Sequence, residues 1–287
     1  MGRVYDRVGR RTILKKITTT LGMAVLSQGT FTACRTLPVL SPTPTIAPPT
    51  ATPTLTLQME EKFARGYIGI ARTGQRWFGG NLVYPLDQGP RPVILVIHDW
   101  WGLNDHTRKI INRFSRAGYA SFAPDIYRGL ITTDPDRARQ FARELSAINA
   151  IRDIRNAINF LLQQDFVSHD KVGIVGFGLG GDLVLKTLLS EENVAAGVVF
   201  YGRPLDVEQT AKVTTPLLSF LGEDDLSIRE RALERMHETL DERGIENEMY
   251  VYPEASHAFF NETGPRYHQD AADDAWIRTL SLNTSFG

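Results

Sequence analysis

Short apolar runs alternate with longer segments of helical periodicity, and this alternation constrains the fold more than any other feature of the sequence. Each run is continuously apolar, which is typical of strands buried on both faces of a sheet. Strands that alternate with helices predict a mostly parallel central sheet covered by helices on both faces, an α/β three-layer sandwich. The runs span residues 92–98, 119–125, 171–177, 196–202, 216–222 and 248–253.

Apolar residues recur at helical spacing between these runs. Such stripes predict helices that pack on the sheet, in segments 110–118, 151–161 and 232–244. The pair Ser227-x-x-Glu230 has the form of a capping box, which predicts the start of the third helix. Residues 77–85, with an earlier extended piece at 67–71, predict an antiparallel hairpin at one edge of the sheet.

Residues 1–34 have the composition of an export signal. The segment opens with arginines and lysines, carries no charge from 17 to 33, and ends at Cys34, the only cysteine. We expect export and a tether to the outer face of the cytoplasmic membrane, in the periplasm or at the cell surface. Either a lipid on Cys34 or an uncleaved anchor would supply the tether. The pair Arg10-Arg11 resembles a twin-arginine signal, and a generic basic region is the alternative.

Residues 35–57 are dominated by proline and threonine, a composition typical of an extended linker, so a domain is expected over 58–287. The chain has 32 basic and 33 acidic side chains, and this balance argues against nucleic acid as a partner. A single cysteine excludes an internal disulfide and a cysteine metal cluster. No cofactor is expected.

The stretch VGIVGFGLGG, from Val172 to Gly181, allows two interpretations. Its glycines match G-x-G-x-x-G, the turn that binds a dinucleotide pyrophosphate. A dinucleotide fold places this turn after its first strand and an acidic residue about 20 positions later. Here earlier strands are predicted, and the next strand ends in Tyr201-Gly202-Arg203, where only Arg203 could meet a phosphate. The second interpretation is the nucleophile elbow of a hydrolase.

The elbow interpretation requires an acid after a later strand and a histidine after the last one. Asp225 follows the run 216–222, and His257 follows the run 248–253. The carboxyl ends of parallel strands meet at one edge of the sheet, where ligands of open α/β folds bind. The order and placement of Asp225 and His257 therefore favour the elbow.

Five segments resemble motifs of the dienelactone hydrolase family, in order and over nearly all of 61–282. They read VIHDWWGLNDH, APDIYRG, GFGLGG, LGEDD and YPEASHAFFN. The resemblance implies an α/β-hydrolase fold and hydrolysis of small esters or lactones by a Cys-His-Asp triad. It also implies an oxyanion hole of backbone N–H groups and an acidic residue that pairs with the resting thiol.

Transferred to this sequence, the resemblance makes His257 the base and Asp225 the acid that orients it, with Asp224 as the neighbouring alternative. The backbone N–H groups of Leu179 and Trp100 would form the oxyanion hole. The resemblance also implies an ester, lactone or carboxylic acid as the small-molecule ligand. The candidate substrate-binding residues are Asp99, Trp101, Tyr127, Arg128 and Arg137, with Phe141 beside them.

Two positions depart from the family pattern. Gly178 stands where the family has its cysteine, and Asp99 stands where it has glutamate. Cys34 lies beyond the linker, no G-x-S-x-G occurs, and Ser256 is expected to point away from the elbow. One hypothesis is hydrolysis by water held in the volume that glycine leaves vacant. The other is a pseudoenzyme that binds a small ligand without turnover, and a dinucleotide-binding oxidoreductase stays as a third.

The other histidines predict no metal site, because none has a partner at ligand spacing. We expect surface or capping roles for them. They are His106, His169, His237 and His268.

Overall fold

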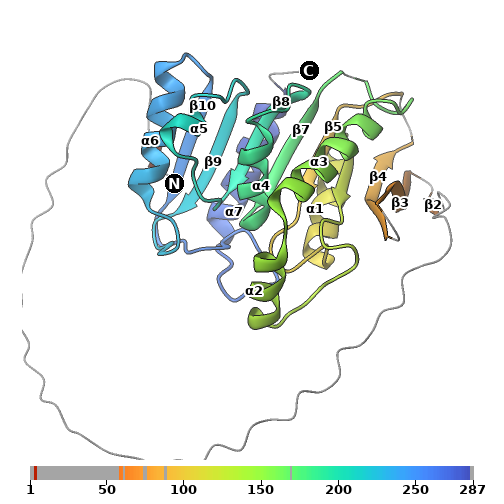
Figure 1. The fold of residues 1–287 in the computed structure, drawn as a ribbon, viewed down its shortest axis with the longest axis horizontal. Coiled ribbons are helices and arrows are strands. Elements are labelled where there is room, and N and C mark those ends of the chain that lie inside the picture. Colours follow the sequence, from red (N-terminus) through yellow and green to blue (C-terminus); the bar gives the residue numbers. More distant parts are fainter. Residues whose placement is uncertain are drawn as a thin grey trace, which may run out of the picture. The chain divides into compact units, whose positions relative to one another are not determined.

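The computed structural model describes residues 3–4, 58–60, 62–73, 76–86, 89–168 and 170–284. Its sheet has the strand order β1-β10-β9-β8-β7-β5-β6-β4-β3-β2 (Figure 1). The strands are β1 (Arg3–Val4), β2 (Gln58–Glu60), β3 (Phe63–Thr73), β4 (Arg76–Pro85), β5 (Val93–Ile97), β6 (Ala120–Pro124), β7 (Val172–Phe177), β8 (Val194–Phe200), β9 (Leu217–Gly222) and β10 (Asn247–Tyr252).

Six strands, β5 to β10, run parallel and are the six predicted runs. Almost all of their residues are buried, as continuous apolar runs require in a sheet covered on both faces. The predicted α/β-hydrolase sandwich is confirmed. The helices are α1 (Asp105–Arg116), α2 (Pro135–Glu144), α3 (Ala147–Leu161), α4 (Leu179–Thr187), α5 (Val207–Thr210), α6 (Glu230–Glu242) and α7 (Gln269–Thr284).

The helices cover both faces of the sheet (Figure 1). On one face, α1 meets α7 through the rings of Phe114 and Trp276, whose centroids are 4.6 Å apart. On the other face, α3 packs beside α4. The core between these layers is one cluster that includes Phe114, Phe122, Phe200 and Phe220.

The helices differ from the sequence predictions at the start of α6 and in elements that no predicted helical segment covers, among them α2, α5 and α7. α6 begins at Glu230 after Arg229 and has no side-chain cap, so the capping box at Ser227 was wrong. Ser227 instead hydrogen-bonds to Asp225, as described below. The helix α7 was not predicted because its buried side chains are mainly alanines, Ala271, Ala272 and Ala275, which give a weak apolar stripe.

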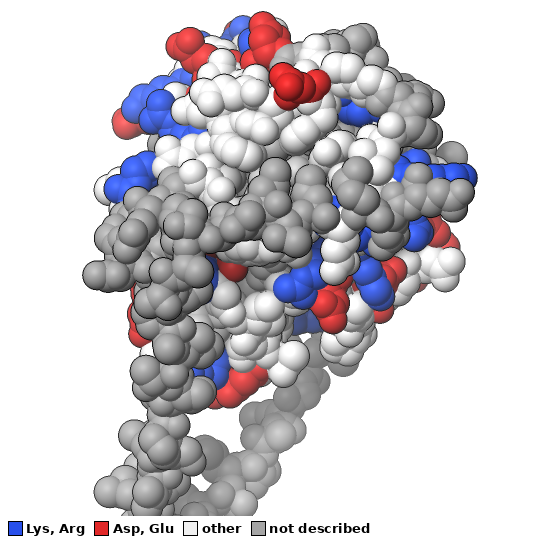
Figure 2. Space-filling model, turned by 90° about the vertical axis from the view of Figure 1, so that its right-hand side faces the viewer, with Lys and Arg blue, Asp and Glu red and all other residues white. Residues whose placement is uncertain are grey.

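The predicted hairpin is β3 and β4, which pair antiparallel, and β4 joins the parallel strands by an antiparallel pairing with β6. Figure 2 shows the face of the molecule at this edge, where basic and acidic side chains are mixed. This pattern fits the net charge of −1.

Most of the predicted export signal and linker lies outside the described residues, including Cys34 and the arginine pair. Only Arg3–Val4 of that segment is described, as strand β1 paired antiparallel with β10. Within the described part of the chain, no helix is long and apolar enough to cross a membrane.

Candidate active site

The turn between β7 and α4 is a sharp elbow at the carboxyl edge of the sheet. Gly178 has φ +53°, and α4 begins at the next residue. A Cβ atom on Gly176 would lie 2.3 Å from the carbonyl oxygen of Gly180, and one on Gly180 would lie 2.3 Å from that of Ile97. These glycines therefore allow the helix to approach the strands, which explains their spacing without a nucleotide.

Arg203, the residue that kept the dinucleotide interpretation open, is already paired. Its Nε donates to Asp182 Oδ2 at 2.7 Å, and its backbone N–H donates to Asp182 Oδ1 at 2.6 Å. Asp182 lies in the first turn of α4, so this pair fixes the end of β8 to the elbow helix. The guanidinium of Arg203 therefore stabilises the elbow and is not available to bind a phosphate.

His257 and Asp225 form a close pair at the ends of two neighbouring strands. The Nδ1–H group of His257 donates to Asp225 Oδ2 at 2.7 Å, and the hydroxyl of Ser227 donates to Asp225 Oδ1 at 2.5 Å. Burial alone would raise the pKa of Asp225, but the hydrogen bonds from His257 and Ser227 outweigh it and lower that pKa. The ionised Asp225 holds the imidazole with Nε2 free to take a proton.

The side chain of Asp99 occupies the position where a nucleophile at residue 178 would stand. A Cβ atom on Gly178 would lie 2.4 Å from Asp99 Oδ1 and 2.9 Å from Asp99 Oδ2. Such distances are far below van der Waals contact. The expectation of a vacant volume beside Gly178 was therefore wrong, because the Asp99 carboxylate fills that volume.

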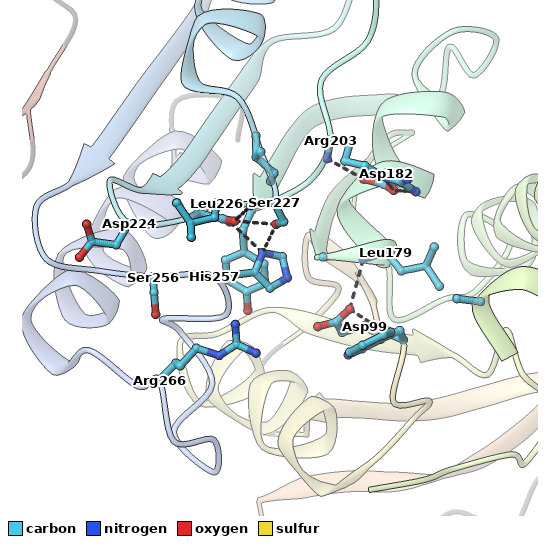
Figure 3. A pocket seen from close by; sticks show the side chains of 16 residues that line it. Asp99, Leu179, Asp182, Arg203, Asp224, Leu226, Ser227, Ser256, His257 and Arg266 are labelled. Carbon is cyan, nitrogen blue, oxygen red and sulfur yellow. Dashed lines mark hydrogen bonds and ion pairs between the residues drawn. The ribbon is translucent and has the colours of Figure 1, made fainter. Parts of the chain in front are cut away.

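The two predicted oxyanion-hole N–H groups converge on one point, and Asp99 occupies it. The N–H of Trp100 donates to Asp99 Oδ1 at 2.6 Å, and the N–H of Leu179 donates to the same oxygen at 3.2 Å (Figure 3). Two convergent N–H groups, of which that of Leu179 lies at the N-terminus of α4, form a binding site for negative charge. In this structure the anion is part of the protein itself.

A buried histidine fixes the backbone of Asp99. The N–H of Ile126 donates to His98 Nε2 at 3.2 Å, so the hydrogen of the neutral ring lies on Nδ1, which donates to the carbonyl oxygen of Asp99 at 2.7 Å. Burial lowers the pKa of His98 to about 4, and the ring therefore stays neutral at physiological pH. His98 was not singled out from the sequence, although it stands beside Asp99.

The pKa of Asp99 is raised to about 6. Burial is the main cause, and the hydrogen bonds from Trp100 and Leu179 and the charge of His257 oppose it. At pH 7 the carboxylate is therefore mostly ionised, although it is a weaker acid than an exposed aspartate. The hydrogen bonds from the Trp100 and Leu179 N–H groups stabilise the ionised Asp99 carboxylate in this buried position.

A pocket of about 550 Å³ opens over this group (Figure 3). It brings together the predicted site residues Asp99, Trp100, Gly178, Leu179, Asp225 and His257, together with the alternative Asp224 and with Ser256. Figure 3 shows the Asp224 side chain directed away from His257. Of the two candidate acids, Asp225 is therefore the one that His257 contacts.

Sequence reasoning missed several residues that line the pocket. Tyr201 packs its ring edge-on against His257, with centroids 5.1 Å apart. Arg266 is exposed, points into the pocket and makes no ion pair with any described residue (Figure 3). The only signal for Arg266 in the sequence was its position, nine residues after His257. The others are Ala142, Asp182, Arg203, Leu226, Ser227 and Ile228.

Four predicted substrate-binding residues do not line this pocket, which therefore does not support that assignment. Tyr127 is buried and packs against His98 and Phe141. Arg128 donates to Asp153 Oδ2 at 2.6 Å, and Arg137 lies on the exposed side of α2. Trp101 packs edge-on against Trp100 and lines a separate cavity of about 10 Å³. All four make packing contacts, hydrogen bonds or ion pairs away from this pocket.

The other described histidines have structural roles, and His237 is buried, contrary to expectation. His237 contacts Asn247 Oδ1 and Ser219 Oγ, while His106 packs among aromatic rings. His268 accepts the N–H of Ala271 at the start of α7, which is a capping role. His169 lies outside the described residues.

Comparisons with known proteins concern the family and the fold of this chain. A model of the dienelactone hydrolase family matches residues 78–286. The chain is 30% identical over 202 residues to protein usf of Aquifex pyrophilus, which covers 67% of this chain and 87% of that protein. It is 28% identical over 221 residues to a Synechocystis protein provisionally named a carboxymethylenebutenolidase, covering 71% of this chain and 89% of that protein.

Solved structures show the same fold. A dienelactone hydrolase-like promiscuous phosphotriesterase from metagenomic libraries superposes with a TM-score of 0.70 at 20% identity, over 78% of this chain and 99% of that one. A dienelactone hydrolase from Anabaena variabilis superposes with a TM-score of 0.58 at 20% identity, over 78% of this chain and 97% of that one. At these identities the likeness concerns the fold.

Proposed function

Because this chain belongs to the dienelactone hydrolase family, we propose that it hydrolyses small carboxylic esters or lactones with water, rather than a cysteine, as the attacking group. The observation that carries this proposal is the His257–Asp225 pair, held at 2.7 Å and facing the same pocket as the elbow. A family fold alone would not support activity, but an oriented base beside an anion site does.

The proposed reaction proceeds by general-base catalysis. His257 Nε2 takes a proton from water, the resulting hydroxide attacks the carbonyl carbon, and His257 returns the proton to the departing alkoxide. The carbonyl oxygen needs the N–H groups of Trp100 and Leu179, which Asp99 now accepts. The substrate must therefore displace the Asp99 carboxylate, and turnover is expected to be slow. In serine proteases, binding and the oxyanion hole alone still give about 10³- to 10⁴-fold acceleration over water.

Arg266 supports a substrate that carries a carboxylate. Its guanidinium lines the pocket and has no ion-pair partner among the described residues. A planar guanidinium recognises a carboxylate through paired N–H donors. The apolar side chains of Trp100, Leu179 and Ile228 would contact the remainder of the molecule.

The second candidate function is ligand binding without turnover. The observation that favours it is the occupation of the oxyanion site by Asp99, which blocks acyl chemistry in the resting protein. In that case the pocket would bind a small carboxylic ligand through Arg266.

The Asp99→Ala variant tests these two functions. We expect natural protein to hydrolyse p-nitrophenyl acetate slowly, and the variant to raise kcat/KM by about tenfold or more. The reason is that each charge-assisted hydrogen bond to Asp99 is worth about 1.5–3 kcal/mol and no longer competes with the substrate. The measurement is release of p-nitrophenol, with lactone opening as a second assay.

Asp224→Ala is the matched control, because Asp224 lines the same pocket without contacting His257. We expect it to leave the rate unchanged. The natural protein and Asp99→Ala could both bind a small carboxylic acid while neither hydrolyses an ester. That result would contradict the hydrolase proposal and favour the binding function.

We further propose that the enzyme is exported and held at the outer face of the cytoplasmic membrane through Cys34. The support is the sequence of residues 1–57, a basic and apolar segment followed by a proline-rich linker. Cell fractionation tests the lipid tether. We expect the natural chain with the membranes and the Cys34→Ser variant in the soluble fraction; equal membrane association of both would exclude lipidation at Cys34.

A further inference from the structure

We propose that Asp99 is itself a covalent nucleophile and that the pocket hydrolyses the carbon–halogen bond of small 2-halocarboxylates. This activity goes beyond ester hydrolysis, although it uses the same pocket and the same histidine. Ester hydrolysis and halide displacement place opposite requirements on the Asp99 carboxylate. An ester must displace the carboxylate, whereas a halide substrate uses it where it stands.

The two oxygens of Asp99 have different surroundings. Oδ1 accepts the N–H groups of Trp100 and Leu179 at 2.6 and 3.2 Å. Oδ2 accepts no hydrogen bond from the described residues, and Asp99 lines the pocket that holds His257. One oxygen is therefore fixed in the oxyanion site while the other is free to attack. His98 and Ile126 hold the backbone that sets this orientation.

Glycine at position 178 is required for this arrangement. Any side chain there would begin 2.4 Å from Asp99 Oδ1 and 2.8 Å from its Cγ atom. The Asp99 carboxylate thus reaches the tip of the elbow from the end of the neighbouring strand β5. Position 178 lacks a nucleophile, and a carboxylate from elsewhere in the chain stands in the same space.

The chemistry of a carboxylate decides which bond it can break. At an ester carbonyl, the carboxylate would be expelled again in preference to an alkoxide, because it is the weaker base. At a saturated carbon that carries a halogen, Oδ2 forms a new carbon–oxygen bond while the halide departs with the bonding electrons. This displacement needs no proton donor and leaves an ester on Asp99.

The pair His257–Asp225 then supplies the second step. His257 Nε2 takes a proton from water, and hydroxide attacks Cγ of Asp99. Negative charge develops on Oδ1, which already accepts the N–H groups of Trp100 and Leu179. Collapse of the intermediate releases a 2-hydroxycarboxylate, whose new hydroxyl takes the proton from His257. Water and the organic halide are consumed, and halide, a proton and the hydroxy acid are formed.

The presence of Arg266 in the pocket indicates a substrate whose halogen lies on the carbon next to a carboxylate. An anionic substrate is repelled by Asp99, and a guanidinium without a described partner in the same pocket offsets this repulsion. Arg203 is engaged by Asp182 and is not available. A carboxylate bound at Arg266 would also activate the adjacent carbon toward displacement.

The test uses the full chain carrying Cys34→Ser, so that no thiol reacts, with 2-bromopropionate as the probe. We expect bromide release by this protein and at least about a 10²-fold lower rate in its Asp99→Asn variant. In the His257→Ala variant the ester should persist, and peptide mass spectrometry should locate it on Asp99 as a hydroxylamine-sensitive adduct. In H₂¹⁸O, a single turnover should give an unlabelled hydroxy acid and put ¹⁸O into Asp99.

Bromide release that persists in Asp99→Asn, or label found directly in the first product, would overturn the proposal. Folding of each variant is checked by its melting temperature. The ester assay separates this proposal from the preceding one, because Asp99→Ala should raise ester hydrolysis and abolish bromide release. Bromide release without ester hydrolysis would leave Asp99 as nucleophile and remove only the ester activity.

Discussion

The Gly178→Cys/Asp99→Ala double variant is expected to hydrolyse p-nitrophenyl acetate at least about 10²-fold faster than the natural chain. The variant restores a thiol at the tip of the elbow and removes the carboxylate that collides with it. In subtilisin, removal of the catalytic triad lowers kcat about 10⁶-fold, and the remaining activity is still about 10³–10⁴-fold faster than the reaction in water. Restoring a nucleophile can therefore raise the rate substantially. The thiolate would lie beside His257 and the N–H groups of Trp100 and Leu179.

The single variants separate the two parts of this expectation. Gly178→Cys alone places its Cβ atom 2.4 Å from Asp99 Oδ1, so we expect a low melting temperature and little gain in rate. Asp99→Ala alone frees the oxyanion site without adding a nucleophile. Iodoacetamide should inactivate the double variant and leave Asp99→Ala active, because Cys34 is present in both and only the double variant has a thiol at position 178. Equal rates in the double variant and Asp99→Ala would show that position 178 is not a nucleophile site.

His257→Ala is expected to lower ester hydrolysis by about 10²- to 10⁴-fold, the usual contribution of a general base. Asp225→Asn should have a similar effect although the side chain keeps its shape, because an amide can stabilise the wrong tautomer of His257. Initial rates of p-nitrophenol release under substrate saturation measure both effects. Melting temperatures show whether either variant is unfolded.

Asp224→Asn is the matched control for this pair. It makes the same chemical change one residue earlier, on an exposed side chain that does not contact His257. We expect its kcat to match that of the natural chain. A large effect of Asp224→Asn with none of Asp225→Asn would contradict the assignment of Asp225 as the orienting acid.

The central strands and the order of the site residues were predictable from the sequence. The continuous apolar runs became β5 to β10, because burial on both faces leaves its mark on every residue of a strand. Asp225 and His257 follow two of these runs directly, and parallel strands carry such residues to one edge. Local pattern and strand direction were sufficient for this part.

The walls of the pocket were not predictable in the same way. Tyr127 and Arg128 follow β6, also at its carboxyl end, yet they pack on His98 and Asp153, outside the pocket. Arg266 lies in the same segment as His257, between β10 and α7, and lines the pocket. Loop conformation depends on contacts between segments far apart in the chain, and no periodicity records it.

The amino-acid sequence places no side chain at Gly178 of the elbow, and it places Asp225 and His257 after later strands. It also places an aspartate at position 99. That these positions share one space follows from the fold alone, because Asp99 and Gly178 follow different strands, β5 and β7, and are 79 residues apart. The volume that glycine leaves is filled by the Asp99 carboxylate, since a buried anion needs N–H donors and the elbow provides two.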